Sequence, residues 1–193
     1  MSHDVSLILA SGSPRRKELL AMTGIPFEID APQVDEQTDL GAHDAVLELS
    51  RRKALAAAAL HPGCVVLGSD TLVAIDDRPL GKPVDEDDAF RMLRELSGRR
   101  HQVYTGVTCV SADGSVYSGV DASNVRFADM TDEEIRSYIA TGEPMDKAGA
   151  YALQGIAGLW IEAVEGTPSG VIGLPLPLTR KLLAACGLKT HTP

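Results

Sequence analysis

Apolar residues in the first third of the chain follow two spacings, which predict alternating strands and helices. Short continuous apolar runs predict strands over residues 6–10, 27–31 and 64–69. Apolar residues three to four positions apart predict helices between these strands, over residues 14–24 and 43–60. Ser13 is placed to cap the first helix, because the Pro14 that follows it suits a first helical position. Five residues of the second helix are expected to face inward, namely Val46, Leu47, Ala54, Leu55 and Ala58.

Turn residues in the middle of the chain predict antiparallel hairpins. Asp76 and Asp77 separate two short strands, and Asp113-Gly114 separates two longer ones. The strands of these two hairpins are expected over residues 71–75, 78–80, 102–111 and 115–127. Three further helices, each closed by a glycine, are expected over residues 85–98, 131–142 and 176–187.

Together these elements predict an α/β fold. Strands alternate with helices early and pair with one another later, which favours a mixed, twisted β-sheet with helices on its faces. No linker divides the chain, so we expect one domain over residues 1–193. A sheet of this size can fold into two lobes around a central cleft.

The charge balance narrows the function classes. The 193 residues include 18 Lys and Arg against 27 Asp and Glu, a net charge of −9, which argues against nucleic acid as a partner. No apolar stretch approaches the ~20 residues of a membrane helix, and the N-terminus lacks a signal-peptide pattern. Three cysteines without paired spacing are expected to be reduced and mostly buried. We therefore expect a cytoplasmic protein that does not bind membranes.

The segment SGSPRR, at residues 11–16, is a candidate phosphate site. Arg15 and Arg16 fall in the first helical turn, where the helix dipole disfavours each exposed cation by ~0.3–1 kcal/mol unless an anion joins it. Free N–H groups and two guanidiniums at a helix N-terminus suit a phosphate. The alternative is a solvated helix start with incidental arginines.

Two carboxylates are candidate catalytic or metal-binding groups. Asp70, in GSDT at the end of a predicted strand, stands where open α/β sheets bind ligands, and it can hold Mg²⁺ or take a proton from water. Glu36 belongs to the polar loop VDEQ. The alternatives are an ordinary strand-end turn for Asp70 and solvated surface charge for Glu36.

Two lysines and one amide complete the candidate set. Lys53 lies in a predicted helix and Lys82 in the loop GKP, and each alone is more typical of a solvated charge. Gln154, in DKAGAYALQG, offers an amide that complements the carbonyl and N–H of a uracil or thymine edge. Because an amide can rotate to suit cytosine, discrimination requires that neighbours hold Gln154. A glycine-rich turn is the alternative interpretation.

Several common nucleotide and hydrolase motifs do not fit. Asp76 stands where a P-loop ending at Gly81-Lys82 needs glycine, Pro83 replaces its Ser or Thr, and no G-x-G-x-x-G occurs. The histidines lack zinc-site spacing, and Ser13 lacks the G-x-S-x-G context of a hydrolase nucleophile. Standard NTPases, Rossmann dehydrogenases, zinc enzymes and serine hydrolases are therefore disfavoured.

Eight features in one order resemble the Maf family of nucleoside triphosphate pyrophosphatases. They are SGSPRR, VDEQ, Lys53, GSDT, LGKP, HQVYTGV, DKAGAYALQG and VIGLPL, and they cover nearly the whole chain. The resemblance implies a two-lobed, ITPase-like α/β fold, a divalent cation (Mg²⁺ or Mn²⁺), a cytoplasmic location and frequent homodimers. It also implies hydrolysis of a nucleoside triphosphate to the monophosphate and pyrophosphate.

The resemblance further implies roles for particular residues. Asp70 would be catalytic, with Glu36 and Asp70 binding the metal. Five side chains would hold the phosphates, namely Ser13, Arg15, Arg16, Lys53 and Lys82. Base choice would rest on Arg15, Thr71 and Gln154. The DKAGAYALQG string resembles the family branch that acts on dTTP and UTP, whereas residues 167–170 (TPSG) depart from the usual pattern and leave the pocket rim less defined.

Two other functions stay open on the sequence alone. One is a pyrophosphatase that prefers purine nucleotides or 7-methyl-GTP. The other is a nucleotide-binding regulator of cell division, because the family is linked to septum formation. A binding module can lose Asp70 or Glu36 without penalty, so the presence of both favours the enzyme.

Overall fold

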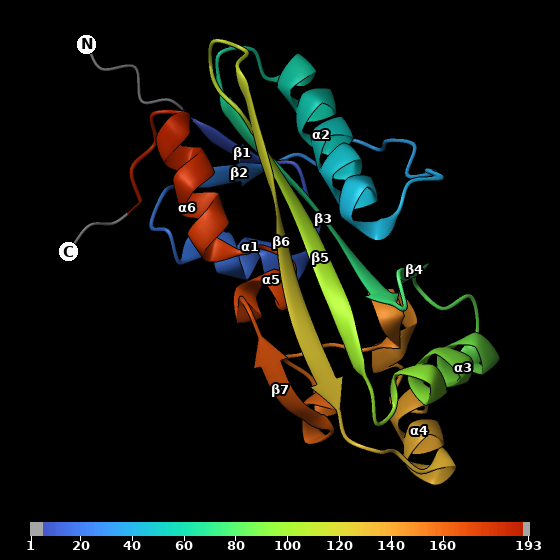
Figure 1. Ribbon diagram of the computed structural model, residues 1–193. Helices are drawn as coiled ribbons and strands as arrows, with labels where there is room; N and C mark the ends of the chain where they lie inside the picture. The colour runs from blue at the N-terminus through green and yellow to red at the C-terminus, as the bar shows by residue number, and fades with distance from the viewer. Residues whose placement is uncertain (1–5, 191–193) are drawn as a thin grey trace.

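The computed structural model describes residues 6–190, which form a seven-stranded sheet flanked by helices (Figure 1). The strands are β1 (Leu7–Leu9), β2 (Phe27–Ile29), β3 (Val65–Ile75), β4 (Arg78–Leu80), β5 (Arg100–Val110), β6 (Val116–Phe127) and β7 (Ile161–Glu165). The helices are α1 (Pro14–Ala21), α2 (Ala42–Leu60), α3 (Glu86–Leu96), α4 (Asp132–Ile139), α5 (Pro168–Ile172) and α6 (Leu176–Ala185), with 3-10 turns η1 (Glu143–Asp146), η2 (Ala148–Ala150) and η3 (Ile156–Leu159).

The sheet is mixed, as predicted. Its strand order is β2-β1-β3-β5-β6-β7, with β4 paired to β3. β1 pairs in parallel with β2 and β3, and the remaining pairs are antiparallel. The α/β fold class is confirmed.

β3 is one long strand, so the prediction that Asp70 ends a strand is wrong. The predicted strands 64–69 and 71–75 are continuous, because β5 pairs with β3 from Val66 to Ala74 and places Gly106 opposite Asp70. On the other edge of β3, β1 pairs only as far as Leu67, and the pairing with β4 begins at Val73. Asp70 therefore lies beside a gap between β1 and β4.

Alternate residues of the short strand β1 pack on opposite faces of the sheet. Leu7 and Leu9 belong to a core cluster shared with α1 and α6, whereas Ile8 belongs to one shared with α2. Because helices cover both faces, the strand is continuously apolar. A separate cluster joins the far ends of β3, β5 and β6 to α3 and α4, so the sheet has two halves, each with its own core (Figure 1).

The helix α2 packs on the sheet through small residues and not through Leu55. Leu55 is 44% exposed, so its predicted inward position is wrong, whereas Ala54 is fully buried. A Cβ on Gly68 would lie 2.7 Å from the Ala54 backbone nitrogen, and one on Gly106 would lie 2.1 Å from the Val46 carbonyl oxygen. The two glycines let the helix backbone approach the centres of β3 and β5.

The predicted turns and caps are mostly present. Asp76 and Asp77 both have positive φ in the hairpin between β3 and β4, and Thr131 forms the predicted capping box. Ser13 occupies the N-cap position of α1, but its side chain makes no capping hydrogen bond. The sequence patterns do not predict β7, whose residues are half-buried or exposed, or the five-residue helix α5.

The three cysteines are free thiols. Cys109 is buried and Cys64 and Cys186 are half-buried, with the Sγ atoms of Cys109 and Cys186 2.9 Å apart. Desolvation raises the pKa of the Cys109 thiol. Within residues 6–190, no helix combines the length and apolarity that crossing a membrane requires.

His101 on β5 is a buried histidine whose titration we expect to affect stability. Its Nε2 lies 2.7 Å from the Tyr151 hydroxyl, and its Nδ1 has no hydrogen-bond partner among the described residues. Burial lowers its pKa to about 4, below the ~6.5 of an unfolded chain. The folded state thus binds fewer protons between these two values, so its stability falls as the pH drops through that window.

We therefore expect His101 to lower the free energy of unfolding by about 2 kcal/mol between pH 7 and pH 5. Urea unfolding at both pH values should show this loss in the wild type and in the control His43→Gln, whose histidine is exposed. The loss should be absent from His101→Gln. An equal pH dependence in all three proteins would contradict the assignment.

Candidate active site

A cavity of about 850 Å³ lies beside the gap in the edge of β3. All nine candidate side chains line it, namely Ser13, Arg15, Arg16, Glu36, Lys53, Asp70, Thr71, Lys82 and Gln154. They come from the start of α1, the loop before α2, α2 itself, β3, the loop after β4 and the segment after η2. The fold therefore gathers, in one cavity, residues that are up to 141 positions apart in the sequence.

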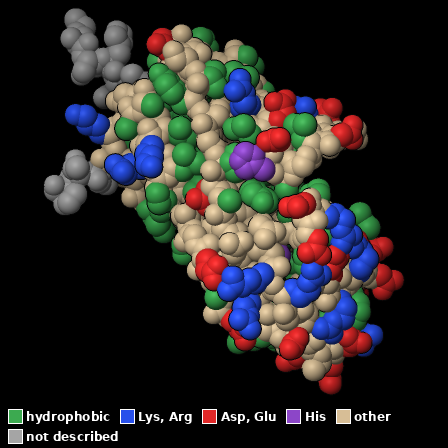
Figure 2. Space-filling model, viewed as in Figure 1, with side chains coloured by type: hydrophobic (Ala, Val, Ile, Leu, Met, Phe, Trp, Pro, Cys, Tyr) green, Lys and Arg blue, Asp and Glu red, His purple; other side chains and the backbone are tan. Residues whose placement is uncertain are grey.

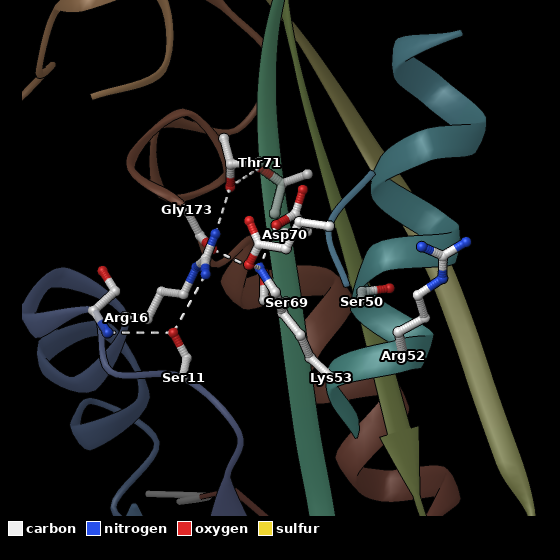
Figure 3. A network of polar contacts seen from close by, with 12 residues as sticks. Ser11, Arg16, Ser50, Arg52, Lys53, Ser69, Asp70, Thr71 and Gly173 are labelled. Atoms are coloured by element: carbon white, nitrogen blue, oxygen red, sulfur yellow. Dashed lines mark hydrogen bonds and ion pairs between the residues drawn. The ribbon is translucent and has the colours of Figure 1, made fainter. Parts of the chain in front are cut away.

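Lys53 lies between the two candidate carboxylates. Its Nζ is 2.6 Å from Asp70 Oδ1 and 2.8 Å from Glu36 Oε1, and Figure 3 shows it reaching from α2 to β3. The Asp70 side chain is only 10% exposed, whereas that of Glu36 is 62% exposed. Two carboxylates and one ammonium leave this cluster with a net negative charge.

The environments of the two carboxylates shift their pKa values in opposite directions. Burial raises the pKa of Asp70, and this effect exceeds the opposing attraction of Lys53 and Arg16. The hydrogen bond from Lys53 lowers the pKa of Glu36. A buried carboxylate with a raised pKa is better suited to accept a proton than an ordinary surface aspartate.

The Arg16 guanidinium binds three parts of the chain. Its Nε donates to the Gly173 carbonyl at 2.9 Å, Nη1 to Ser11 Oγ at 3.3 Å and Nη2 to Thr71 Oγ1 at 3.1 Å (Figure 3). Ser69 Oγ donates to the same Gly173 carbonyl at 2.9 Å. Arg16 thus ties α1 to β3 and to the connection between α5 and α6, while some of its five N–H donors stay available to a ligand.

Arg15 and Lys82 differ from Arg16 in how they interact with the protein. Among residues 6–190, neither side chain makes a hydrogen bond or an ion pair, although both line the cavity. The first turn of α1 carries no acidic residue that would neutralise the arginines. These two cations and the helix N-terminus are therefore free to bind an anion.

The remaining wall of the cavity comes from the segment that carries Gln154. Tyr151, Leu153 and Gln154 line the cavity, and so does Lys147, to which the sequence analysis gives no role. The Lys147 side chain is only 12% exposed and pairs with Asp146. Its position in DKAGAYALQG is the feature of the sequence that could have marked Lys147 as a candidate. Its burial depends on tertiary packing, which the segment alone does not reveal.

The carboxylate pair fits a divalent cation that takes some of its ligands from the protein and the others from a bound substrate. The described residues contain no cluster of three or more His, Cys, Asp or Glu side chains that would bind a metal alone. Mg²⁺, however, is commonly held by one or two carboxylates together with phosphate oxygens and waters. Glu36 and Asp70 each contact Lys53 through one oxygen, which leaves the other oxygen for such a cation.

The family assignment rests on the sequence comparison. The family model described as Maf-like protein matches residues 6–186. The chain belongs to the Maf family. This confirms the resemblance noted from the eight features and accounts for their common order along the chain.

Maf relatives match nearly the whole chain. The dTTP/UTP pyrophosphatase of Vibrio parahaemolyticus is 50% identical, covering 95% of this chain and 98% of the relative. The proteins of the same name from Symbiobacterium thermophilum and Anaeromyxobacter dehalogenans are 47% and 50% identical, covering 96% and 94% of this chain and the same shares of their own lengths.

Two solved structures are similar to part of this Maf chain. A nucleoside-triphosphatase, or dITP/XTP pyrophosphatase, from Mycobacterium abscessus has a TM-score of 0.42 at 17% identity, covering 65% of this chain and 76% of its own. The Ham1 protein of Staphylococcus aureus has a TM-score of 0.48 at 14% identity, covering 64% and 72%.

Proposed function

We propose that this chain hydrolyses dTTP and UTP, and related modified pyrimidine nucleotides, to the nucleoside monophosphate and pyrophosphate. Relatives that are about half identical over nearly their full length carry the name dTTP/UTP pyrophosphatase. The observation that carries the proposal is that one cavity joins unpaired cations, a buried carboxylate and an accessible amide. These groups suit a triphosphate, a water nucleophile and a pyrimidine edge respectively.

The triphosphate is assigned to the end of the cavity formed by α1 and the loop after β4. Arg15 and Lys82 neutralise phosphate oxygens directly, since neither is paired with a protein group among the described residues. Ser13 and the first N–H groups of α1 add donors at the positive end of the helix dipole. Arg16 and Lys53 contribute further positive charge from fixed positions.

Glu36 and Asp70 are proposed to hold one divalent cation, Mg²⁺ or Mn²⁺. When bound, such a cation draws charge from the phosphate oxygens and stabilises the leaving pyrophosphate. The chain supplies the two carboxylates, and Lys53 fixes their separation by binding both.

Asp70 is proposed to accept a proton from the attacking water. The water oxygen forms a bond to the α-phosphorus as Asp70 takes the proton, and the bond from the α-phosphorus to the bridging oxygen breaks. Pyrophosphate leaves with that electron pair, and the monophosphate keeps the water oxygen. Lys53 holds the Asp70 carboxylate at 2.6 Å and so orients it for this transfer.

We assign the selection of the nucleobase mainly to Gln154, and we expect Arg15 and Thr71 to contribute to it. The Gln154 amide can pair with the carbonyl and N–H of a uracil or thymine ring. The Thr71 hydroxyl accepts from Arg16 and lies 2.9 Å from Thr105 Oγ1, so we assign Thr71 an indirect role through the position of Arg16.

We further propose that residues 1–193 act as one domain in the cytoplasm, as a homodimer that does not bind nucleic acid. The three long strands run through both halves of the sheet, which favours one unit. Basic and acidic side chains are intermixed on the face shown in Figure 2, and the net charge is −9. Neither property favours a polyanionic partner.

A nucleotide panel tests this function. Pyrophosphate release should be fastest with dTTP and UTP among dTTP, UTP, CTP, GTP, ITP and 7-methyl-GTP, in the presence of Mg²⁺ or Mn²⁺. Preference for a purine would place the chain in a different branch of the family. Binding of nucleotides without release of pyrophosphate would instead support a nucleotide-binding regulator.

A further inference from the structure

The segment that carries Gln154 leaves that side chain without direct support. Residues 151–156, here called the Gln154 loop, form a tight turn in which the Gly155 N–H donates to the Ala152 carbonyl at 3.1 Å. Gln154 itself is exposed, and within residues 6–190 its amide has no hydrogen-bond partner. The position of the amide therefore depends on how the loop backbone is held.

Glu143 holds the C-terminal end of this loop. It lies in η1, and its Oε1 accepts from the Ile156 N–H at 3.1 Å. Its Oε2 accepts from the Tyr138 hydroxyl at 2.6 Å. Tyr138 lies on the buried face of α4 and is 1% exposed, so it anchors the carboxylate to the core of the fold.

Glycine at position 155 shows how closely Glu143 packs against the loop. A Cβ at this position would lie 2.0 Å from Glu143 Oε1, so only a glycine allows the carboxylate to reach the backbone. The N-terminal end of the loop is held separately, because the Tyr151 hydroxyl contacts His101. Glu143 is thus the anchor on the Gln154 side.

We propose that Glu143 is a positioning residue for pyrimidine selection, which acts on the base through the backbone of the Gln154 loop and not by contact with the substrate. The inference rests on the proposed function, since it assigns Gln154 to the base. An amide distinguishes uracil from cytosine only if it is held in one orientation, and loss of the anchor lets the loop shift so that it accepts either base.

The test compares kcat/KM for UTP and for CTP in Glu143→Ala, Glu143→Gln and the wild type. In Glu143→Ala we expect the UTP-to-CTP ratio to fall about 10-fold, mainly through a higher KM for UTP, because about one hydrogen bond to the base is lost. The kcat at saturating UTP should stay within about 3-fold, because Asp70 and Lys53 are untouched. Glu143→Gln should restore the ratio, since its amide can accept from Ile156 and donate to Tyr138.

Three further variants keep the test decisive. Glu133→Ala, an exposed glutamate in α4, should keep the wild-type ratio. Tyr138→Phe removes one anchor contact without emptying the core and should lower the ratio partly, even if Glu143→Ala folds poorly. Glu143→Ala combined with Gln154→Ala should lower it no further than Gln154→Ala alone, because both act on one contact.

The outcomes separate the two proposals. A folded Glu143→Ala that keeps the wild-type ratio, or that loses UTP and CTP turnover equally, overturns the positioning role and leaves the function intact. A wild type that does not prefer UTP over CTP overturns the proposed base assignment, and the positioning role falls with it.

Discussion

Asp70→Asn should turn over UTP about 10²–10⁴-fold more slowly than the wild type, because an amide cannot take the proton of the attacking water. The substitution keeps the size and shape of the side chain. Lys53 also retains its contact with Glu36 at 2.8 Å, so the variant should remain folded. Pyrophosphate release at saturating UTP measures the loss, and thermal unfolding checks the fold.

Asp87→Asn is the matched control for this variant. Asp87 is exposed on α3 and does not line the cavity, so its substitution should leave turnover unchanged. Turnover near that of the wild type in a folded Asp70→Asn protein would remove Asp70 from the role of base.

Lys53→Met should lower both the stability of the protein and its turnover of UTP. This change leaves two carboxylates facing each other without the ammonium that binds both, and one of them, Asp70, is only 10% exposed. Removing one partner of a buried ion pair costs about 3 kcal/mol, so we expect a fall of that order in the free energy of unfolding. We also expect kcat/KM for UTP to fall by at least about 10²-fold, since the base is no longer oriented.

A control and a double variant make this prediction specific. Lys181→Met removes an exposed lysine of α6 and should change neither stability nor turnover. Because Lys53 and Asp70 are in contact, Lys53→Met combined with Asp70→Asn should lose far less than the product of the two single losses. Strict additivity, or a stable Lys53→Met protein with full turnover, would show that the lysine does not act through Asp70.

The sequence predicts a strand where the local apolar pattern determines it. It does not predict a strand whose extent depends on pairing with a neighbouring strand. The apolar run of β1 is evident from sequence because both of its faces are covered. The continuity of β3 is not evident from sequence, because Gly68-Ser69-Asp70-Thr71 has the composition of a turn. Pairing with β5 keeps this segment extended. Leu55 was misplaced for a similar reason, because the glycines of the sheet select the small face of α2.

Motifs could predict which residues gather around the cavity, but not the contacts that these residues make with one another. All nine candidates line one cavity. The contacts of Lys53 with both carboxylates and of Arg16 with Gly173 depend on how distant segments pack. Glu143 lies only a few residues before DKAGAYALQG. Its carboxylate accepts a hydrogen bond from the Ile156 N–H, a contact that no local pattern indicates.

Hydrolysis of UTP in water enriched in ¹⁸O tests the central claim most directly. Attack on the α-phosphorus predicts that the isotope enters UMP and that the released pyrophosphate is unlabelled. Isotope in pyrophosphate or in inorganic phosphate, with UMP unlabelled, would mean that water attacks a different phosphorus and would contradict the proposed reaction.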